Sequence, residues 1–278
     1  MLTDQFPEIV EEAASWSGSI VLDGELLAWD HDSPAPFSEL QRRLGRKNVS
    51  VKMRNDVPVL FMSYDLLEFD GVDFRNKSTQ ERRSILQSWS SRISSKYFGI
   101  SPLIDACSWE VVLRLREESR RRRVEGIMLK RKEAPYHSGR KKGDWWKWKV
   151  APYTIDAIMI YAQLGHGRRA GLYTDYTFAV WNEDSLVPIA KAYSGLSDLD
   201  IRKVDRWIRQ NTTDSHGPVR VLEPKQVFEI AFEGINESKR HKSGIAVRFP
   251  RIIRWRKDKL PKDADSLKMV RSLLAVDS

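Results

Sequence analysis

Apolar residues in the first half of the chain fall into runs that predict strands, and stretches with helical periodicity lie between these runs. The predicted strands of this half are residues 19–29, 57–67, 125–131 and 144–150. The predicted helices are residues 36–44, 78–95 and 108–122. Ser78 and Glu81 have the spacing of a capping box, and Asp70-Gly71 is a turn signal that follows the second strand.

Short β-rich runs dominate the second half of the chain from Thr154 onward. The predicted strands of this half are residues 154–163, 172–181, 186–192, 219–221, 226–232 and 245–249. The predicted helices are residues 197–210 and 264–275. Many short strands at close spacing are typical of a small barrel. The change in pattern predicts two domains, residues 1–151 and residues 152–278.

The composition indicates a globular protein. Hydrophobic residues make up 41% of the 278 residues, and ten Trp and ten Phe provide apolar area for a core. No apolar run approaches the roughly 18 residues of a membrane span. A single cysteine, Cys107, excludes an internal disulfide and a Cys-type structural zinc site, so a reducing, cytoplasmic setting is expected. Cys107 lies just before an apolar helix, and we expect it to be a small buried side chain.

The net charge of +9 favours a polyanionic partner, because basic proteins bind polyanions through counterion release. Residues 239–259 hold nine Lys and Arg and one acidic residue, with aromatic side chains at Phe249 and Trp255. Such local clustering is a stronger sign of nucleic-acid binding than net charge. A merely basic soluble enzyme remains the alternative. The four arginines at 120–123 fit either phosphate contact or a solvated helix end.

Two segments place polar or aromatic groups inside predicted strands. Asp23-Gly24-Glu25 interrupts the first strand, where a buried carboxylate is costly unless it is paired or used. On its own this segment is more typical of a turn at a strand end. Tyr64, in the second strand, is either a core aromatic or a flat platform for a base.

Two further segments combine charge with strand alternation. Glu125 precedes a glycine, which permits a ligand to approach the backbone, and Lys130 is expected on the opposite face of that strand. In the segment WWKWK at 145–149, Lys147 and Lys149 share one face and two indoles share the other. Two lysines on an inner face require an anion, so the segment predicts a phosphate site. An amphipathic edge strand with solvated lysines is the alternative.

Five segments in chain order resemble motifs III, IIIa, IV, V and VI of ATP-dependent DNA ligases, which belong to the covalent nucleotidyltransferase superfamily. They are DGE (23–25), SYDLLEFDG (63–71), EGIMLKR (125–131), WWKWK (145–149) and RFPRIIRWRKDK (248–259). Residues 232–244 are similar to the bacterial branch of this family. The resemblance spans nearly the whole chain. It implies an α+β protein, with an N-terminally incomplete nucleotidyltransferase (ATP-grasp-like adenylation) domain followed by an OB-fold β-barrel domain.

The resemblance implies nucleotide contacts in the first domain. Glu25 would hydrogen-bond the ribose, Tyr64 would stack on adenine, and Glu125 would hold a divalent metal ion, Mg²⁺. Lys147 and Lys149 would neutralise the α-phosphate. The implied set of residues that bind ATP and Mg²⁺ is Glu25, Tyr64, Glu125, Lys130, Lys147 and Lys149.

The resemblance also implies roles in the second domain. Arg256, Asp258 and Lys259 match the RxDK element, which in this family orients the pyrophosphate leaving group. Together with Lys147 and Lys149 of motif V, these three residues form the implied catalytic set. The implied partner is nicked double-stranded DNA, and no association with a membrane is expected. DNA contacts are implied for Arg248, Phe249, Arg251 and Arg254.

One departure concerns the nucleophile, the lysine of motif I, KxDG. The two Asp-Gly pairs of this sequence have Val21 and Glu68 at the lysine position. The resemblance is therefore to the C-terminal part of a ligase, and an upstream half would supply the lysine and a DNA-binding domain. This chain alone is expected to be deficient in self-adenylylation. The alternatives are one half of a split ligase, a non-catalytic basic OB-fold DNA-binding remnant, and an RNA ligase or capping-type enzyme, which the long RFPR segment disfavours.

Overall fold

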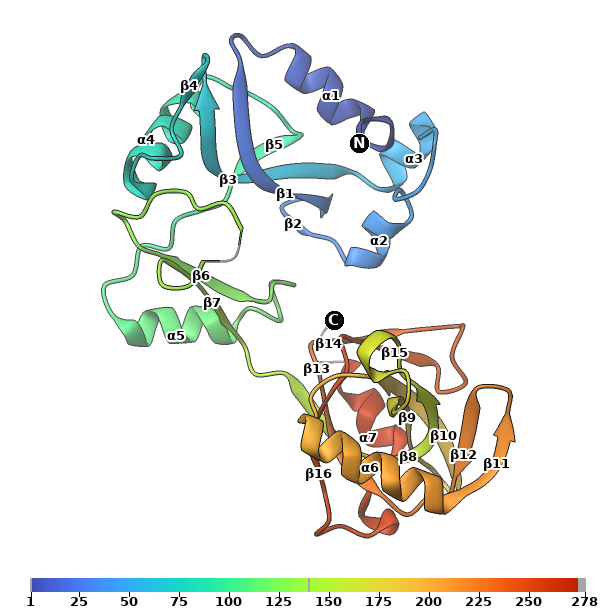
Figure 1. Cartoon of the computed structure of the whole chain (residues 1–278). Coiled ribbons are helices and arrows are strands. Elements are labelled where there is room, and N and C mark those ends of the chain that lie inside the picture. Colours follow the sequence, from blue (N-terminus) through green and yellow to red (C-terminus); the bar gives the residue numbers. More distant parts are fainter. Residues whose placement is uncertain (1, 140, 275–278) are drawn as a thin grey trace. The chain divides into compact units, whose positions relative to one another are not determined.

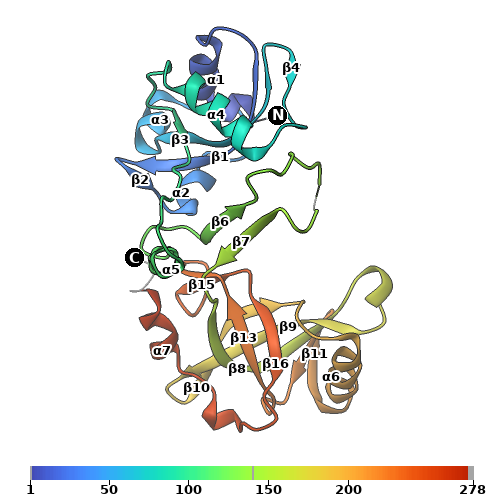
Figure 2. The ribbon, with the colours of Figure 1, turned by 90° about the vertical axis from the view of Figure 1, so that its left-hand side faces the viewer.

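The computed structural model describes residues 2–139 and 141–274. The chain folds into two compact units, Met1–Val150 and Ala151–Ser278, and each is described by itself. Figures 1 and 2 show that the first unit is mixed α and β and that the second is a strongly curved sheet with two helices.

The first unit is built on a long antiparallel pair, β1 (Ile20–Asp30) and β3 (Val59–Phe69). Three short strands complete this sheet: β2 (Ser33–Pro34), β4 (Val72–Asp73) and β5 (Phe98–Ile100), the last parallel to β3. The helices of the unit are α1 (Pro7–Ala14), α2 (Phe37–Gln41), α3 (Val51–Asp56), α4 (Thr79–Ser90) and α5 (Trp109–Glu117). A 3₁₀ turn, η1, spans Thr3–Gln5.

Helix α4 covers one face of this sheet. It begins at the capping box that the sequence predicts, because the Ser78 side chain accepts from the Glu81 backbone N–H and the Glu81 carboxylate accepts from Ser78. Its apolar side packs Leu86 and Trp89 against Leu66 and Phe98 of the sheet. This packing fixes the position of the polar residues on the first turn of α4.

A separate two-stranded antiparallel sheet joins β6 (Gly126–Lys130) to β7 (Trp145–Lys149). Gly126 has φ +150° and lies so close to the partner strand that a Cβ atom there would be 2.3 Å from the Trp148 carbonyl oxygen. Only glycine fits this approach. Helix α5 is attached to the same sheet, because the Arg116 guanidinium donates to the Lys149 carbonyl oxygen at 2.6 Å.

The second unit is a seven-stranded antiparallel sheet that curls around an apolar core. Its strands are β8 (Tyr153–Leu164), β9 (Tyr173–Asn182), β10 (Ser185–Ala192), β11 (Thr212–His216), β12 (Val219–Leu222), β13 (Val227–Phe232) and β16 (Arg251–Trp255). A hairpin of β14 (Gly234–Glu237) and β15 (Ile245–Arg248) precedes the last strand. Helices α6 (Asp198–Asn211) and α7 (Leu267–Ser272) and the 3₁₀ turns η2 (Gly167–Arg169) and η3 (Pro261–Asp263) complete the unit.

Most predicted strands and helices are present, and the differences have local causes. Helix α5 ends at Glu117, five residues before the predicted end, and the arginine run continues as a turn. The basic segment contains a strand, β16, that the sequence did not predict. The end of the last predicted helix, Ala275, lies outside the described residues.

Two further expectations were wrong. Cys107 is exposed, because it lies in the irregular segment before α5 and not under the helix. Asp23-Gly24-Glu25 does not end a strand but lies inside β1, at a register shift between Asp23 and Gly24. Among the described residues no helix is long and apolar enough to span a membrane.

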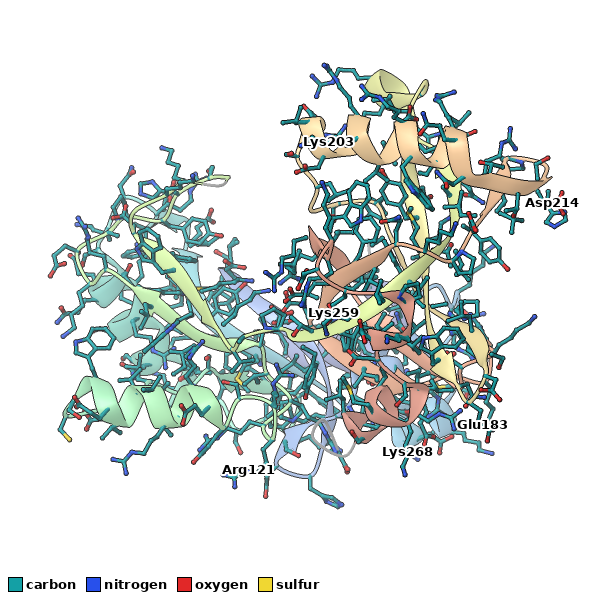
Figure 3. All side chains as sticks on the ribbon, turned by 90° about the horizontal axis from the view of Figure 1, so that it is seen from below. Arg121, Glu183, Lys203, Asp214, Lys259 and Lys268 are labelled. Carbon is teal, nitrogen blue, oxygen red and sulfur yellow. The ribbon has the colours of Figure 1, made fainter. Side chains whose placement is uncertain are left out.

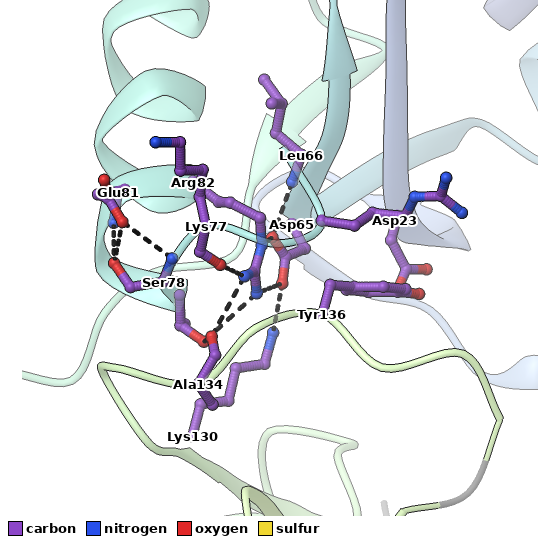
Figure 4. Close-up of polar contacts among 12 residues, drawn as sticks. Asp23, Asp65, Leu66, Lys77, Ser78, Glu81, Arg82, Lys130, Ala134 and Tyr136 are labelled. Atoms are coloured by element: carbon purple, nitrogen blue, oxygen red, sulfur yellow. Dashed lines mark hydrogen bonds and ion pairs between the residues drawn. The ribbon is translucent and has the colours of Figure 1, made fainter. Parts of the chain in front are cut away.

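A buried ion pair links α4 to the sheet. The Arg82 guanidinium contacts both carboxylate oxygens of Asp65 at 2.7 and 2.9 Å, and the two side chains are 0% and 2% exposed (Figure 4). Arg82 also donates to the carbonyl oxygens of Lys77 (2.5 Å) and Ala134 (3.2 Å). One guanidinium therefore joins β3, the start of α4 and the loop after β6.

We expect the Arg82→Met variant to lose about 3–5 kcal/mol of unfolding free energy, because it leaves the Asp65 carboxylate buried without its main partner. Urea denaturation followed by tryptophan fluorescence measures the change. The matched control is Arg75→Met, which removes the exposed pair with Asp73 and should leave the midpoint unchanged. The double variant Asp65→Leu/Arg82→Met should recover much of the loss, and equal losses in the single and double variants would contradict the pairing argument.

Candidate functional site

Tyr64 stands at the centre of a polar cluster on the β1–β3 sheet. Its hydroxyl donates to the Asp23 carboxylate at 3.1 Å, and the Tyr136 hydroxyl donates to the other oxygen of Asp23 at 2.7 Å. Burial and the Asp23 charge raise the pKa of Tyr64 above its usual value. Burial and the hydrogen bond to Asp23 raise the pKa of Tyr136 to about 12. Asp23 therefore holds both phenols protonated and fixes the tilt of both rings.

Glu25 lies on the same face of the sheet as Tyr64. It pairs in register with Met62, which is two residues from Tyr64, and side chains two apart on a strand share a face. The Glu25 charge is close enough to contribute to the raised pKa of Tyr64. Glu25 itself is exposed, so its carboxylate is available to a ligand that lies on the ring.

Lys130 connects this cluster to the β6–β7 sheet. Its ammonium lies 3.9 Å from the Asp65 carboxylate (Figure 4). It also lies 4.8 Å from the centre of the Tyr64 ring and 3.8 Å from the centre of the Trp145 ring. Burial lowers the pKa of Lys130, although the Asp65 and Asp23 charges act in the opposite direction. A base that stacks on Tyr64 has to use the ring face that Lys130 does not cover, or displace the ammonium.

The two lysines of β7 continue this surface. Trp145, Lys147 and Lys149 share one face of the strand by alternation, and Trp148 points to the other, where it contacts Trp109 and Arg116. At a rise of about 3.3 Å per residue, Lys147 lies roughly 7 Å and Lys149 roughly 13 Å beyond Trp145 along the strand. Cations thus follow the aromatic end of the site at spacings that suit a nucleotide's phosphates.

Glu125 is placed differently from the expectation. Its carboxylate forms an ion pair with Lys149 at 2.8 Å, so it lies on the lysine face and not opposite Lys130. The positive φ of Gly126 interrupts the regular alternation and explains the difference. Among the described residues no three His, Cys, Asp or Glu side chains gather into a metal site. A single carboxylate still suits Mg²⁺, which is commonly held by one or two carboxylates together with substrate phosphates.

The RxDK residues lie in the second unit, where a buried carboxylate binds two of them. Asp156 on β8 accepts from Arg256 at 3.1 Å and from Lys259 at 2.5 Å (Lys259 is labelled in Figure 3). Arg256 also donates to Asp258 at 2.7 Å, which raises the pKa of Arg256 and lowers that of Asp258 to about 2. Burial raises the pKa of the neighbouring Asp265. The element is therefore held in a defined geometry by its own barrel.

Two of the arginines that are expected to contact DNA form ion pairs with glutamates of the same unit. Arg251 pairs with Glu233 at 2.7 Å and Arg254 with Glu229 at 2.6 Å. Arg248 lies over the Phe249 ring, 4.9 Å from its centre, and Phe249 is exposed. A count of basic residues in the sequence does not reveal these acidic partners. Glu229 lies on the neighbouring strand β13, and Glu233 lies between β13 and β14.

Tyr136 and Arg82 of the first-unit cluster were not singled out from the sequence, and Asp23 was noted only as part of the DGE segment, without a role of its own. Asp23 and Tyr136 are separated by 113 positions, so no local pattern connects them. Tyr136, His137 and Asp144 also line a small pocket beside Trp145, in which His137 and Asp144 are hydrogen-bonded at 2.7 Å. The only sequence feature that could have indicated Tyr136 is its place, as an aromatic residue, in the Gly- and Lys-rich loop between two predicted strands.

Family models match both units. Residues 1–149 match the ATP dependent DNA ligase domain, and residues 169–259 match the ATP dependent DNA ligase C terminal region. The chain is 38% identical to a probable DNA ligase of Koribacter versatilis over 98% of its own length and 51% of that protein. It is 34% identical to a probable DNA ligase of Opitutus terrae, over 99% of its length and 30% of that protein. The chain thus spans about half the length, or less, of these two relatives.

Solved structures share the fold. The structure named Pmar-Lig_PreS3 aligns with 91% of this chain and 54% of its own, with a TM-score of 0.65 and 18% identity. A Lig E DNA ligase aligns with 84% of this chain and 76% of its own, with a TM-score of 0.59 and 19% identity. At these identities the likeness concerns the fold alone.

We expect the Asp23→Asn variant to ionise Tyr136 at a lower pH, because the variant removes the carboxylate that holds the phenol protonated. The difference between ultraviolet titrations of each protein and its Tyr136→Phe counterpart isolates this hydroxyl. Because the folded pKa of about 12 exceeds the unfolded value of about 10, the contribution of Tyr136 to stability is present below pH 10 and is lost as the pH rises through 12. Asp30→Asn, on the same strand, is the control, and an unshifted titration in Asp23→Asn would refute the assignment.

Proposed function

This chain belongs to the family of ATP-dependent DNA ligases, and we propose that it takes part in sealing nicks between a 5′-phosphate and a 3′-OH in duplex DNA. The first unit would act as the adenylation domain and the second as the OB-fold domain. The observation that carries the proposal is one continuous surface in the first unit, on which Tyr64, Lys130 and Trp145 are followed by Lys147 and Lys149.

Tasks are proposed for individual residues of the first unit and of the RxDK element. Adenine stacks on Tyr64, whose ring Asp23 holds in place, and Glu25 hydrogen-bonds the ribose. Lys147 and Lys149 neutralise the α-phosphate, where negative charge builds up during transfer. Glu125 would hold the divalent metal ion, Mg²⁺, which would neutralise phosphate charge there, and it also holds Lys149 in an ion pair at 2.8 Å. Arg256 and Lys259 orient the pyrophosphate that leaves.

The proposed reaction has three balanced steps. A lysine amine attacks the α-phosphorus of ATP, and the bond to pyrophosphate breaks. The AMP group then passes to the 5′-phosphate at the nick and frees the lysine. The 3′-OH attacks that phosphate, and AMP leaves. The first step needs the motif I lysine as nucleophile, and the second needs it as the leaving group when the 5′-phosphate oxygen attacks. The third step needs only the nucleotide site and the DNA surface.

We infer that residues 1–278 alone do not form the covalent lysine–AMP adduct, since Val21 and Glu68 occupy the KxDG lysine positions. Incubation with labelled ATP and Mg²⁺, followed by denaturing electrophoresis, should give no labelled band. Addition of an upstream half that carries KxDG should give label on that half and sealing of a nicked duplex. A labelled band on residues 1–278 alone that disappears in Lys147→Ala would overturn these roles.

A nick that already carries a 5′-adenylate tests the site without the missing lysine. We expect residues 1–278 to seal this substrate, and Lys147→Ala and Lys149→Ala to slow sealing by about 10²-fold, as loss of a charge-stabilising group commonly does. Lys141→Ala, an exposed lysine of the preceding loop, is the matched control and should seal normally.

A non-catalytic DNA-binding module is the second candidate, favoured by the basic second unit. It predicts binding of the adenylated nick without sealing, both alone and with the upstream half. Denaturing gels for sealing and native gels for binding, run on the same reactions, separate the two functions.

A further inference from the structure

Two exposed aromatic side chains border one shallow groove of the second unit. Tyr193, after β10, is 72% exposed, and Phe249, between β15 and β16, is 62% exposed. The groove encloses about 300 Å³. Its lining residues are Lys191, Tyr193, Ser194, Phe249, Pro250 and Arg251.

The backbone under both aromatics is held firmly. The Ser194 carbonyl oxygen accepts from the Ile252 N–H at 2.9 Å. Gly195 has φ +108°, and a Cβ atom there would be 1.8 Å from the Ile252 carbonyl oxygen, so the turn after Tyr193 is pressed against β16. Phe249 has φ +52°, an uncommon conformation for a bulky residue. Two large apolar rings are thus displayed to solvent by backbone that has little freedom to withdraw them.

The cations of the groove already have acidic partners. Lys191 pairs with Asp175 at 3.0 Å, and Arg251 pairs with Glu233 at 2.7 Å. Their charges are partly neutralised, and the groove offers in addition the Tyr193 ring and the face of the Phe249 ring that Arg248 does not cover. A ligand of this groove therefore gains most from stacking or apolar contact, while the surrounding basic surface supplies attraction to phosphates.

We propose that Tyr193 is a specificity-determining residue which, together with Phe249, recognises the interrupted base step of a nicked duplex. This inference rests on the proposed ligase function. Apolar side chains that enter a groove of DNA partly unstack a base step at a cost of a few kcal/mol. A nick lowers that cost because one backbone no longer holds the step. Aromatic contact is also independent of sequence, as a nick-sealing protein requires.

The role of Tyr193 goes beyond the resemblance, which implies DNA contact for Phe249 but not for Tyr193. Tyr193 and Phe249 directly follow β10 and β15, two strands that are distant in the sequence but neighbours in the fold. Two aromatic rings at one groove can contact the base pairs on both sides of the interrupted step, whereas one inserted side chain contacts fewer of them.

The experiment compares binding of nicked and intact duplexes of one sequence by fluorescence anisotropy, over a range of salt concentrations. We expect the wild-type chain to prefer the nicked duplex and Tyr193→Ala to lose that preference through a roughly tenfold weaker binding of nicked DNA. The slope of affinity against salt should not change, because no phosphate-binding cation is removed. Tyr193→Phe should keep the preference. Leu199→Ala, which removes an exposed apolar side chain of α6, is the control.

The outcomes separate this inference from the proposed function. A Tyr193→Ala variant that folds, as thermal denaturation reports, and still prefers the nick overturns the role of Tyr193, even if sealing of the adenylated nick supports the ligase function. A wild-type chain that binds both duplexes equally also overturns it. Failure of the wild-type chain to bind either duplex would count against the proposed function as well.

Discussion

The buried contact between Asp65 and Arg82 sets the geometry of the first unit. A charged pair with almost no exposure is costly to bury, so it persists only where hydrogen bonds satisfy both groups. Arg82 meets this condition by also donating to carbonyl oxygens at Lys77 and Ala134. The loop after β6 is thereby held against α4, and Lys130 at its start is held over Tyr64. The proposed nucleotide surface thus depends on a pair that would not contact the nucleotide.

Charge is arranged in a similar way in both units. Two of the proposed phosphate-binding cations rest on carboxylates, Lys149 on Glu125 in the first unit and Arg256 on Asp156 in the second. Such pairs hold long side chains in one orientation and so reduce the entropy lost when a ligand binds. They also mean that the 47 Lys and Arg residues overstate the positive charge that is available to a ligand.

The sequence was informative where the signal is local. Strand runs, the capping box of α4 and the alternation of β7 follow from neighbouring residues, and the order of five short motifs identified the family. The contacts of Asp23 with Tyr136 and of Lys259 with Asp156 were not predictable, because they join positions 113 and 103 apart. The exact place of Glu125 was missed because regular alternation does not account for a glycine with positive φ.

Asp156 pairs with both Arg256 and Lys259, so an anion that binds these two cations has to replace the Asp156 carboxylate as their partner. Arg256 and Lys259 share one carboxylate, so a ligand that takes both cations leaves a buried negative charge behind. A singly charged anion merely substitutes for Asp156 and gains little by Coulomb attraction. An anion of higher valence would gain from two cations at once, and this gain could offset the cost of leaving the Asp156 carboxylate without its partners. On the proposed function, this pairing would favour a polyvalent anion such as pyrophosphate over a singly charged one.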